Sequence, residues 1–358
     1  MQTGIIGLPQ VGKTTLFKIL TKANVDARAG QAQTHVGIAR VPEPRLDKLA
    51  VLFKPKKVTY ATIEYVDVGG LAREKARESA SLNQLREVDA LAHVVRAFEN
   101  PTVPHPAGSV DPLRDIENFD LELVLVDLDQ VVRRLERLEK DLKKKKEQIL
   151  EFEQAVLLRC KKALESAQSL RELEFTPDER KTLTGFMFLS LRPILYVLNV
   201  GDEEVAELDA AIEKHGLGKF SSKPNTAVVP ICGRIEAELA ELDDAAAAEL
   251  LAAYGLKSTG LNRVIHASYA LLGLTSFFTA GEPEVRAWTI RQGMSAQKAA
   301  GVIHSDIEKG FIKAEVVRWD QLLEAGSWAA ARERAWLRLE GKEYIVQEGD
   351  VILFRHSG

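Results

Sequence analysis

The chain has 358 residues, enough for about two or three domains with a sizeable buried core. Its 46% hydrophobic and 28% charged residues are typical of globular proteins and exclude a disordered, fibrous or disulfide-stapled chain. Two cysteines, Cys160 and Cys232, are too few for a disulfide framework or a four-ligand zinc site, so we expect a reducing compartment. With 48 basic and 52 acidic side chains the formal net charge is −4, so any binding to nucleic acid must be local.

Targeting and membrane segments are not evident in the sequence. The N-terminus lacks the basic and apolar regions of a secretory signal, and no window approaches about 18 uninterrupted apolar residues. We therefore expect a cytoplasmic, soluble protein that does not bind membranes.

Short apolar segments alternate with helical stretches along much of the chain. Strands are predicted for residues 1–6, 58–66, 90–95, 193–198 and 227–231. The first strand leads into a Gly-rich turn and then into a helix that begins at Lys13. This order predicts the α/β class, with a doubly wound parallel sheet.

Residues 113–176 contain neither Pro nor Gly and predict long helices. The apolar residues follow the 3,4 spacing of a coiled coil: Leu128, Val131, Leu135, Leu138, Leu142, Ile149, Phe152 and Val156. The core position between Leu142 and Ile149 falls on Lys145, within the four consecutive lysines 143–146, whose charges repel one another. The pattern therefore predicts two antiparallel helices that join near these lysines, in an arm of roughly 20 residues per side. The alternative is a single helix with a solvated lysine face.

The last part of the chain has a different character. Residues 277–278, 285–290 and 351–354 predict strands, with a helix over residues 296–303 between them. This pattern indicates a small, separate α+β domain.

The strongest motif follows the first strand. It reads Gly7-Leu8-Pro9-Gln10-Val11-Gly12-Lys13-Thr14-Thr15 and matches the P-loop pattern G-x-x-x-x-G-K-[ST] between a strand and a helix. In such loops the backbone N–H groups wrap the phosphates, the Lys reaches the β- and γ-phosphates, and the hydroxyl after it ligates Mg²⁺. Lys13 and Thr14 are predicted to take these two roles.

A second motif, Asp67-Val68-Gly69-Gly70, closes the second predicted strand. P-loop proteins hold Mg²⁺ through an Asp at a strand end and sense the γ-phosphate with a Gly amide, so Asp67 is a predicted metal ligand and Gly70 a predicted phosphate contact. Leu71 occupies the position where Ras-type enzymes use Gln to orient the attacking water. Because an alkyl chain cannot orient water, hydrolysis needs another group or is slow without a partner.

A third motif, Asn199-Val200-Gly201-Asp202, follows the strand over residues 193–198, where a base-reading N-K-x-D loop is expected. An Asp carboxylate can accept from both N1–H and N2–H₂ of guanine, whereas adenine has no such pair of donors, so Asp202 favours GTP. Val200, in place of Lys, favours a relaxed base pocket.

With these motifs, the chain closely resembles the YchF family, the Obg-like ATPases, along nearly its full length. Further family-like stretches are Val41-Pro42-Glu43-Pro44-Arg45-Leu46, Ile231-Cys232-Gly233-Arg234-Ile235-Glu236-Ala237-Glu238, Phe277-Phe278-Thr279-Ala280-Gly281, Val285-Arg286-Ala287-Trp288-Thr289-Ile290 and Ala300-Gly301-Val302-Ile303-His304-Ser305-Asp306. The resemblance implies a P-loop GTPase-like domain over residues 1–115 and 190–275, a helical coiled-coil insertion over 116–189, and an α+β, ubiquitin-like TGS domain over 276–358.

The resemblance also implies ATP hydrolysis with Mg²⁺, often in preference to GTP, and an association with ribosomes and stress responses. Leu71 fits the family's hydrophobic replacement of the catalytic Gln. His105 resembles a family His proposed to compensate, although a lone loop His more often has no role. Cys232 and Gly233 lie in the segment that resembles the family's base-contacting loop, where Cys232 is either a small buried hydrophobe or a redox switch.

This sequence departs from the family pattern at three places. Gln10 stands where the family usually has Asn, which puts a potassium requirement in question, and Asp202 stands where it usually has Glu, which leaves ATP and GTP both open. The family's first-switch Thr aligns with Gln31, so that Thr is either displaced to Thr34 or absent.

Two functions follow from these features. In the first, Mg²⁺-dependent cleavage of ATP or GTP is a switch that the arm and the TGS domain transmit to the ribosome. In the second, the arm and the TGS domain bind RNA or a ribosomal surface, and the nucleotide only tunes that affinity. We expect a monomer in either case, and we favour the enzyme because Lys13, Thr14 and Asp67 retain the phosphate-binding machinery.

Overall fold

The structure is a computed structural model that describes residues 1–22, 35–68 and 84–357. Its contacts divide the chain into two compact units, the first formed by Met1–Gly37 with Glu64–Leu271 and the second by Ile38–Ile63 with Leu272–Gly358. The predicted division placed residues 38–63 in the nucleotide-binding domain, whereas their contacts group them with the C-terminal segment.

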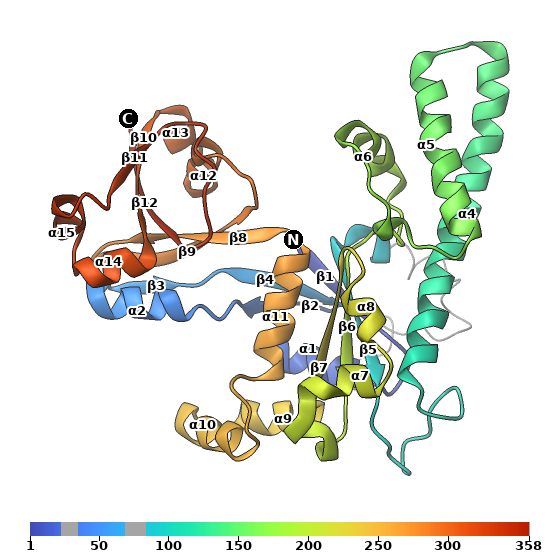
Figure 1. Ribbon diagram of the computed structural model, residues 1–358, viewed down its shortest axis with the longest axis horizontal. Coiled ribbons are helices and arrows are strands. Elements are labelled where there is room, and N and C mark those ends of the chain that lie inside the picture. The colour runs from blue at the N-terminus through green and yellow to red at the C-terminus, as the bar shows by residue number, and fades with distance from the viewer. Residues whose placement is uncertain (23–34, 69–83, 358) are drawn as a thin grey trace. The chain divides into compact units, whose positions relative to one another are not determined.

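A six-stranded sheet in the order β2-β4-β1-β5-β6-β7 forms the centre of the first unit (Figure 1). Its strands are β1 (Gln2–Ile6), β2 (His35–Arg40), β4 (Thr62–Asp67), β5 (Ala90–Arg96), β6 (Ile194–Asn199) and β7 (Thr226–Ile231). The five strands from β4 to β7 run parallel, so their carboxyl ends lie at one edge. Every residue of β5 and β6 is buried, as expected for central strands of a covered parallel sheet. The predicted α/β class is confirmed.

Helices follow most of these strands. They are α1 (Lys13–Thr21), α4 (Pro112–Lys144), α5 (Gln148–Glu165), α6 (Pro177–Leu183), α7 (Ala211–Lys214), α8 (Gly218–Ser221), α9 (Gly233–Glu241), α10 (Asp244–Ala253) and α11 (Gly260–Leu271), with 3-10 helices at Leu170–Glu172, Thr184–Phe186 and Asp202–Ala210. Among the described residues, none of the helices is at once long and apolar enough to cross a membrane.

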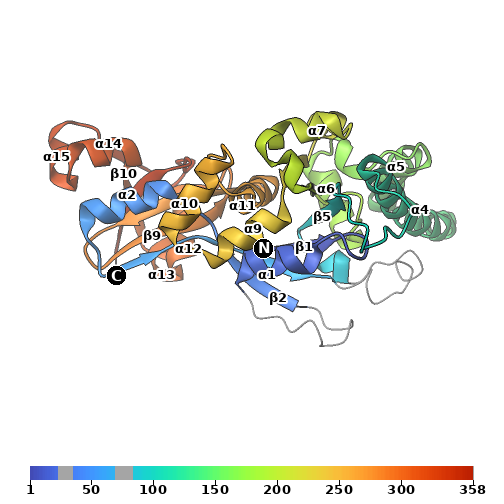
Figure 2. The same cartoon turned by 90° about the horizontal axis from the view of Figure 1, so that it is seen from below.

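The predicted arm is a hairpin of α4 and α5, which lie side by side in both views (Figure 1, Figure 2). Asp111 caps α4 by accepting a hydrogen bond from the backbone N of Arg114 at 3.0 Å, and Pro112 occupies the first turn. The chain reverses between Lys144 and Gln148, within the lysine run. The hairpin prediction is therefore confirmed.

The predicted apolar seam is correct on α4 and partly wrong on α5. Leu135 and Leu138 of α4 are buried, but Ile149 is 79% exposed and Phe152 is 43% exposed. Leu150 and Leu157 pack into the hairpin core instead. A heptad pattern does not continue through the turn, because α5 begins after a non-helical connection with its own rotation about the helix axis.

The second unit contains another six-stranded sheet, in the order β11-β10-β12-β8-β9-β3. Its elements are α2 (Pro44–Phe53), β3 (Lys57–Thr59), β8 (Leu274–Ala280), β9 (Glu284–Arg291), α12 (Ala296–Ile303), α13 (Ser305–Lys309), β10 (Phe311–Arg318), α14 (Trp319–Ala325), α15 (Trp328–Glu333), β11 (Arg338–Glu340) and β12 (Asp350–His356). β8 and β9 form an antiparallel pair, and β3 adds to β9 in parallel. The predicted C-terminal α+β character is thus present in this unit.

The single strand predicted over residues 58–66 is wrong. Two strands replace it, β3 in the second sheet and β4 in the first, with Tyr60 and Ala61 between them. The alternation of side chains over residues 58–66 fits one long strand as well as two short ones. The break becomes evident only from the partners, because β3 pairs with β9 and β4 pairs with β1.

Candidate nucleotide-binding site

The loop between β1 and α1 has a backbone that only glycine fits at two positions. Gly7 has a φ of 142°, and a Cβ there would lie 2.4 Å from the carbonyl oxygen of Val94. Gly12 has a φ of 102°, and its Cβ would lie 2.6 Å from Nδ2 of Asn199. The two glycines of the motif therefore allow the loop to pack tightly at the carboxyl edge of the sheet, with the N-terminus of α1 directly after it.

Lys13 is the first residue of α1, and its ammonium group contacts a neutral acceptor. Its Nζ donates to the carbonyl oxygen of Leu8 at 2.6 Å. Burial lowers the pKa of Lys13 to about 8, and nearby Asp67 only partly opposes that shift. A phosphate group beside the ammonium would supply the missing negative charge.

Asp67 ends β4, where it lies opposite Ile5 in the parallel register. Its carboxylate is buried and accepts no hydrogen bond from any residue the structure describes. Burial raises the pKa of Asp67, while Lys13 and His35 oppose the shift. Such a carboxylate fits a divalent cation, and the hydroxyl of Thr14 would offer a second oxygen ligand of the same hard type.

No group of three or more His, Cys, Asp or Glu side chains that could hold a metal ion occurs in the described part of the chain. A divalent cation at Thr14 and Asp67 would therefore take its remaining ligands from phosphate oxygens and water, as Mg²⁺ prefers.

Asn199, at the end of β6, ties three loops together. Its Nδ2 donates to the carbonyl oxygen of Val11 at 2.9 Å, and its Oδ1 accepts from the backbone N of Gly233 at 2.9 Å. The side chain is buried, so both bonds form in a low-dielectric setting where losing either would leave a polar group unsatisfied. Asn199 thereby fixes the P-loop against the loop before α9.

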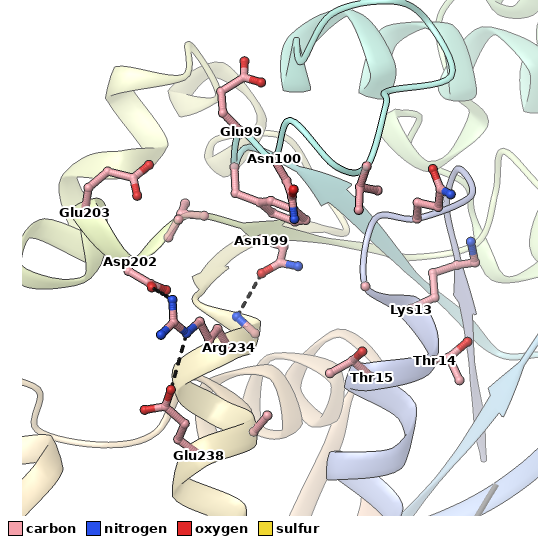
Figure 3. A pocket seen from close by; sticks show the side chains of 18 of the residues that line it. Lys13, Thr14, Thr15, Glu99, Asn100, Asn199, Asp202, Glu203, Arg234 and Glu238 are labelled. Atoms are coloured by element: carbon pink, nitrogen blue, oxygen red, sulfur yellow. Dashed lines mark hydrogen bonds and ion pairs between the residues drawn. The ribbon is translucent and has the colours of Figure 1, made fainter. Parts of the chain in front are cut away.

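These loops surround a cavity of about 820 Å³, a size that suits a nucleotide (Figure 3). The cavity is lined by Gln10, Gly12, Lys13, Thr14, Thr15, Phe98, Glu99, Asn100, Val103, Asn199, Val200, Gly201, Asp202, Glu203, Gly233, Arg234, Ala237, Glu238 and Glu241. Lys13, Thr14 and Thr15 line one side, and Asp202 and Arg234 line the other. The predicted phosphate contacts and the predicted base contacts therefore lie on different sides of the cavity.

Nine predicted nucleotide contacts line this cavity: Gln10, Gly12, Lys13, Thr14, Thr15, Asn199, Val200, Asp202 and Gly233. Gly7, Pro9, Val11, Asp67 and Cys232 do not line it, although Val11 and Cys232 contact residues that do. Gly70, Leu71, Gln31 and Thr34 lie outside the described residues. The roles of all these residues stay predictions.

Cys232 lies at the base side of the site, where its Sγ is 3.4 Å from Oδ1 of Asp202. Burial raises the pKa of Cys232 to about 11, and the pKa of Cys160 to about 12. The thiolate is the reactive form, so neither thiol has the character of a redox switch at neutral pH. Burial and a raised pKa instead support the role of a small buried residue for Cys232.

His105 does not line the cavity. Its ring is buried, with Nε2 3.1 Å from Oδ2 of Asp115 in α4 and Nδ1 accepting from the backbone N of Ala107 at 3.2 Å. These contacts anchor the loop between β5 and α4. A catalytic role for His105 therefore has no support in this geometry.

Two segments that line the cavity were not predicted as parts of the site: the loop after β5 and the start of α9. Phe98, Glu99, Asn100 and Val103 follow β5 at the carboxyl edge, while Arg234 and Glu238 lie in the first turns of α9. One general signal was available: ligands of open parallel sheets bind at the carboxyl ends of the strands, so every segment that follows a strand is a candidate.

Comparisons with known proteins agree along the whole chain. The YchF-GTPase_C family model, described as a protein of unknown function, matches residues 274–357, and a model described as a 50S ribosome-binding GTPase matches residues 2–162. A protein of Bacillus subtilis named ribosome-binding ATPase YchF is 42% identical over 365 residues, covering 100% of this chain and 99% of the relative. The protein of that name from Pasteurella multocida is 43% identical and covers 99% and 98%.

A solved structure gives the same result. The Schizosaccharomyces pombe YchF GTPase superposes with a TM-score of 0.85 at 29% identity, over 99% of this chain and 97% of that chain. The predicted resemblance is confirmed: the chain belongs to the YchF family.

Proposed function

We propose that this protein is a Mg²⁺-dependent nucleoside triphosphatase that prefers ATP, accepts GTP and acts as a ribosome-associated switch in translation or the stress response. The observation that carries the proposal is a partly buried Lys13 in a nucleotide-sized cavity, with the buried carboxylate of Asp67 close enough to oppose the shift of its pKa. Among the described residues, Asp67 accepts no hydrogen bond. The similarity of the full chain to relatives named ribosome-binding ATPase supports the choice of ATP as substrate and the ribosome as partner. We expect the protein to work as a cytoplasmic monomer.

In this proposal the P-loop binds the phosphates through its backbone N–H groups and the ammonium of Lys13. Thr14 and Asp67 would hold Mg²⁺, which neutralises charge on the phosphates when it is bound. Asn199 keeps the P-loop and the base loop in register through its two hydrogen bonds. The site therefore contributes mainly positioning and electrostatic stabilisation.

Neither Leu71 nor His105, the two residues predicted at or in place of the catalytic Gln, supports orientation of the attacking water. Leu71 carries an alkyl side chain, and His105 is held against Asp115 outside the cavity. We therefore expect slow intrinsic turnover that increases when a partner supplies or orders the missing group.

The alternative function is an RNA- or ribosome-binding module that the nucleotide only tunes. The observation that favours it is the tip of the hairpin, where the four lysines 143–146 are exposed beside a hollow that Leu142 also lines. Exposed lysines at the end of a projecting hairpin suit a phosphate backbone. The C-terminal unit, the predicted TGS domain, would provide the second contact.

Two variants separate these functions. In Lys13→Ala, the switch predicts loss of phosphate release and loss of any nucleotide-dependent change in co-sedimentation with ribosomes, whereas the binding module predicts only a shifted affinity. In Lys143→Glu/Lys144→Glu, the binding module predicts loss of co-sedimentation with intact phosphate release by the free protein. Lys161→Glu/Lys162→Glu on α5 is the matched control, because it makes the same charge change away from the tip. Phosphate release that survives in Lys13→Ala would overturn the switch.

A further inference from the structure

The base side of the cavity holds an ion pair that the sequence motif does not predict. Nη1 of Arg234 lies 2.5 Å from Oδ2 of Asp202, and Nε of Arg234 lies 3.4 Å from a carboxylate oxygen of Glu238 (Figure 3). The other oxygen of Asp202, Oδ1, accepts from Sγ of Cys232 at 3.4 Å. Each carboxylate oxygen of the predicted guanine reader therefore already has one partner, which leaves it a reduced capacity to accept from a base.

The two purines make different demands on this carboxylate. Guanine presents two adjacent donors, N1–H and N2–H₂, and needs an acceptor with both oxygens available. Adenine presents one donor, the N6 amino group, beside one acceptor, N1. The Arg234–Asp202 pair presents an N–H donor beside a carboxylate acceptor, which is the complement of adenine's edge.

We propose that Arg234 is a specificity-determining residue, which occupies Asp202 and thereby biases the site toward adenine nucleotides. The inference rests on the proposed function, because it concerns the substrate of the same cavity. It also explains how an Asp at the base-reading position is compatible with ATP: a free carboxylate would repel adenine N1, whereas a carboxylate paired with a guanidinium does not.

The exposure of the Arg234 and Asp202 side chains determines how strongly their ion pair should affect the preference between adenine and guanine nucleotides. The side chain of Arg234 is 71% exposed and that of Asp202 is 42% exposed, so solvent screens their attraction. Removing such a pair should change relative affinity about threefold to fivefold rather than by orders of magnitude. Glu238 helps to hold Arg234 in place, so its loss should act in the same direction but less strongly.

The experiment measures dissociation constants for ADP and GDP, each with a fluorescent label on the ribose, so that only the base differs. The proteins are wild type, Arg234→Ala, Asp202→Asn and the double variant Asp202→Asn/Arg234→Ala. Arg133→Ala is the matched control, because Arg133 is 70% exposed and pairs with Asp129 on α4 at 2.9 Å, away from the cavity. ATP cleavage by the wild type is measured in parallel.

We expect Arg234→Ala to raise the affinity for GDP relative to ADP by about threefold or more. This gain should vanish in the double variant, because Asn presents an N–H group to guanine's own donors, and Arg133→Ala should leave the ratio unchanged. An unchanged ratio in Arg234→Ala, or a shift toward ADP, overturns the inference while the ATP assay still tests the proposed function. If wild type binds neither nucleotide, both proposals fail.

Discussion

The base of the helical hairpin and the edge of the parallel sheet each bury an aspartate, but the two carboxylates have different surroundings. Asp127 of α4 accepts from the backbone N of Leu189 at 3.0 Å, and from the backbone N and the Oγ of Ser190 at 2.7 and 2.6 Å. Asp67 accepts no hydrogen bond within the described parts of the chain. Burial raises the pKa of both groups, so only their partners distinguish them.

This difference separates structural from functional polar groups. A buried carboxylate whose lone pairs are filled by its own chain fixes local geometry, as Asp127 joins α4 to the segment before β6. A buried carboxylate left without donors keeps its lone pairs for a ligand. The same contrast holds for Lys13, whose only hydrogen bond among the described residues goes to a neutral carbonyl.

The largest expected effect follows from removing the unsatisfied cation. Lys13→Ala should weaken ATP binding about 100-fold, because about two charge-assisted hydrogen bonds to phosphate are lost. Isothermal titration calorimetry with Mg²⁺ measures this change. Lys18→Ala, on the same helix but outside the cavity, should bind as the wild type does. An ATP affinity of Lys13→Ala within threefold of wild type would show that Lys13 does not contact the phosphates.

Removing the satisfied carboxylate should act on stability instead. Asp127→Ala should lower the free energy of unfolding by about 2 kcal/mol, because the buried N–H groups of Leu189 and Ser190 lose their acceptor. Urea unfolding measures this loss, and ATP affinity should stay within twofold of wild type. Asp129→Ala, which removes an exposed carboxylate two residues further along α4, should cost less than about 0.5 kcal/mol. Equal losses in the two variants would contradict the contrast.

Asn199 both shapes the cavity and satisfies buried backbone groups, so its removal should affect ATP binding and stability together. Asn199→Ala removes the links to Val11 and Gly233, so we expect about tenfold weaker ATP binding together with a smaller loss of stability. Titration calorimetry and urea unfolding on the same preparation separate the two. Unchanged affinity would show that the P-loop holds its shape without Asn199.

The smallest effect on ATP affinity is expected from a change at Cys232. Burial raises the pKa of its thiol to about 11. Cys232→Ser should change ATP affinity less than about twofold, because Ser also donates to Asp202. In the native protein, alkylation by iodoacetamide should be slow at pH 7 and should rise about tenfold per pH unit through pH 10, since thiolate is the minor form below the pKa. Mass spectrometry of labelled protein measures this rate, with urea-unfolded protein as the reference. A rate that levels off near pH 8.5 would contradict the raised pKa.

Local sequence predicts much of this protein. The buried strands β5 and β6, the P-loop and the hairpin turn at the lysines all depend on short-range patterns, and each lies where it was expected. The cavity also unites Lys13 with Asn199 and Asp202, which lie far from Lys13 in the chain, because parallel strands end at one edge.

The features that the sequence did not predict depend on contacts between distant segments, which local patterns do not encode. β3 joins β9, more than 200 residues away, so residues 38–63 leave the unit that flanks them. Exposure of Ile149 and Phe152 depends on how α5 is rotated after the turn. The placement of Arg234 on Asp202, and of His105 on Asp115, depends on side-chain directions that only the assembled loops define.

The central claim is that the P-loop cavity cleaves a nucleoside triphosphate. Single-turnover cleavage of ATP by the purified protein tests it most directly, with Mg²⁺ or with chelator, for wild type beside Lys13→Ala, and with ribosomes added in a second series. The account predicts slow Mg²⁺-dependent cleavage by wild type, faster cleavage with ribosomes, and no cleavage by Lys13→Ala under either condition. Equal cleavage by wild type and Lys13→Ala, or none by wild type even with ribosomes, would contradict it.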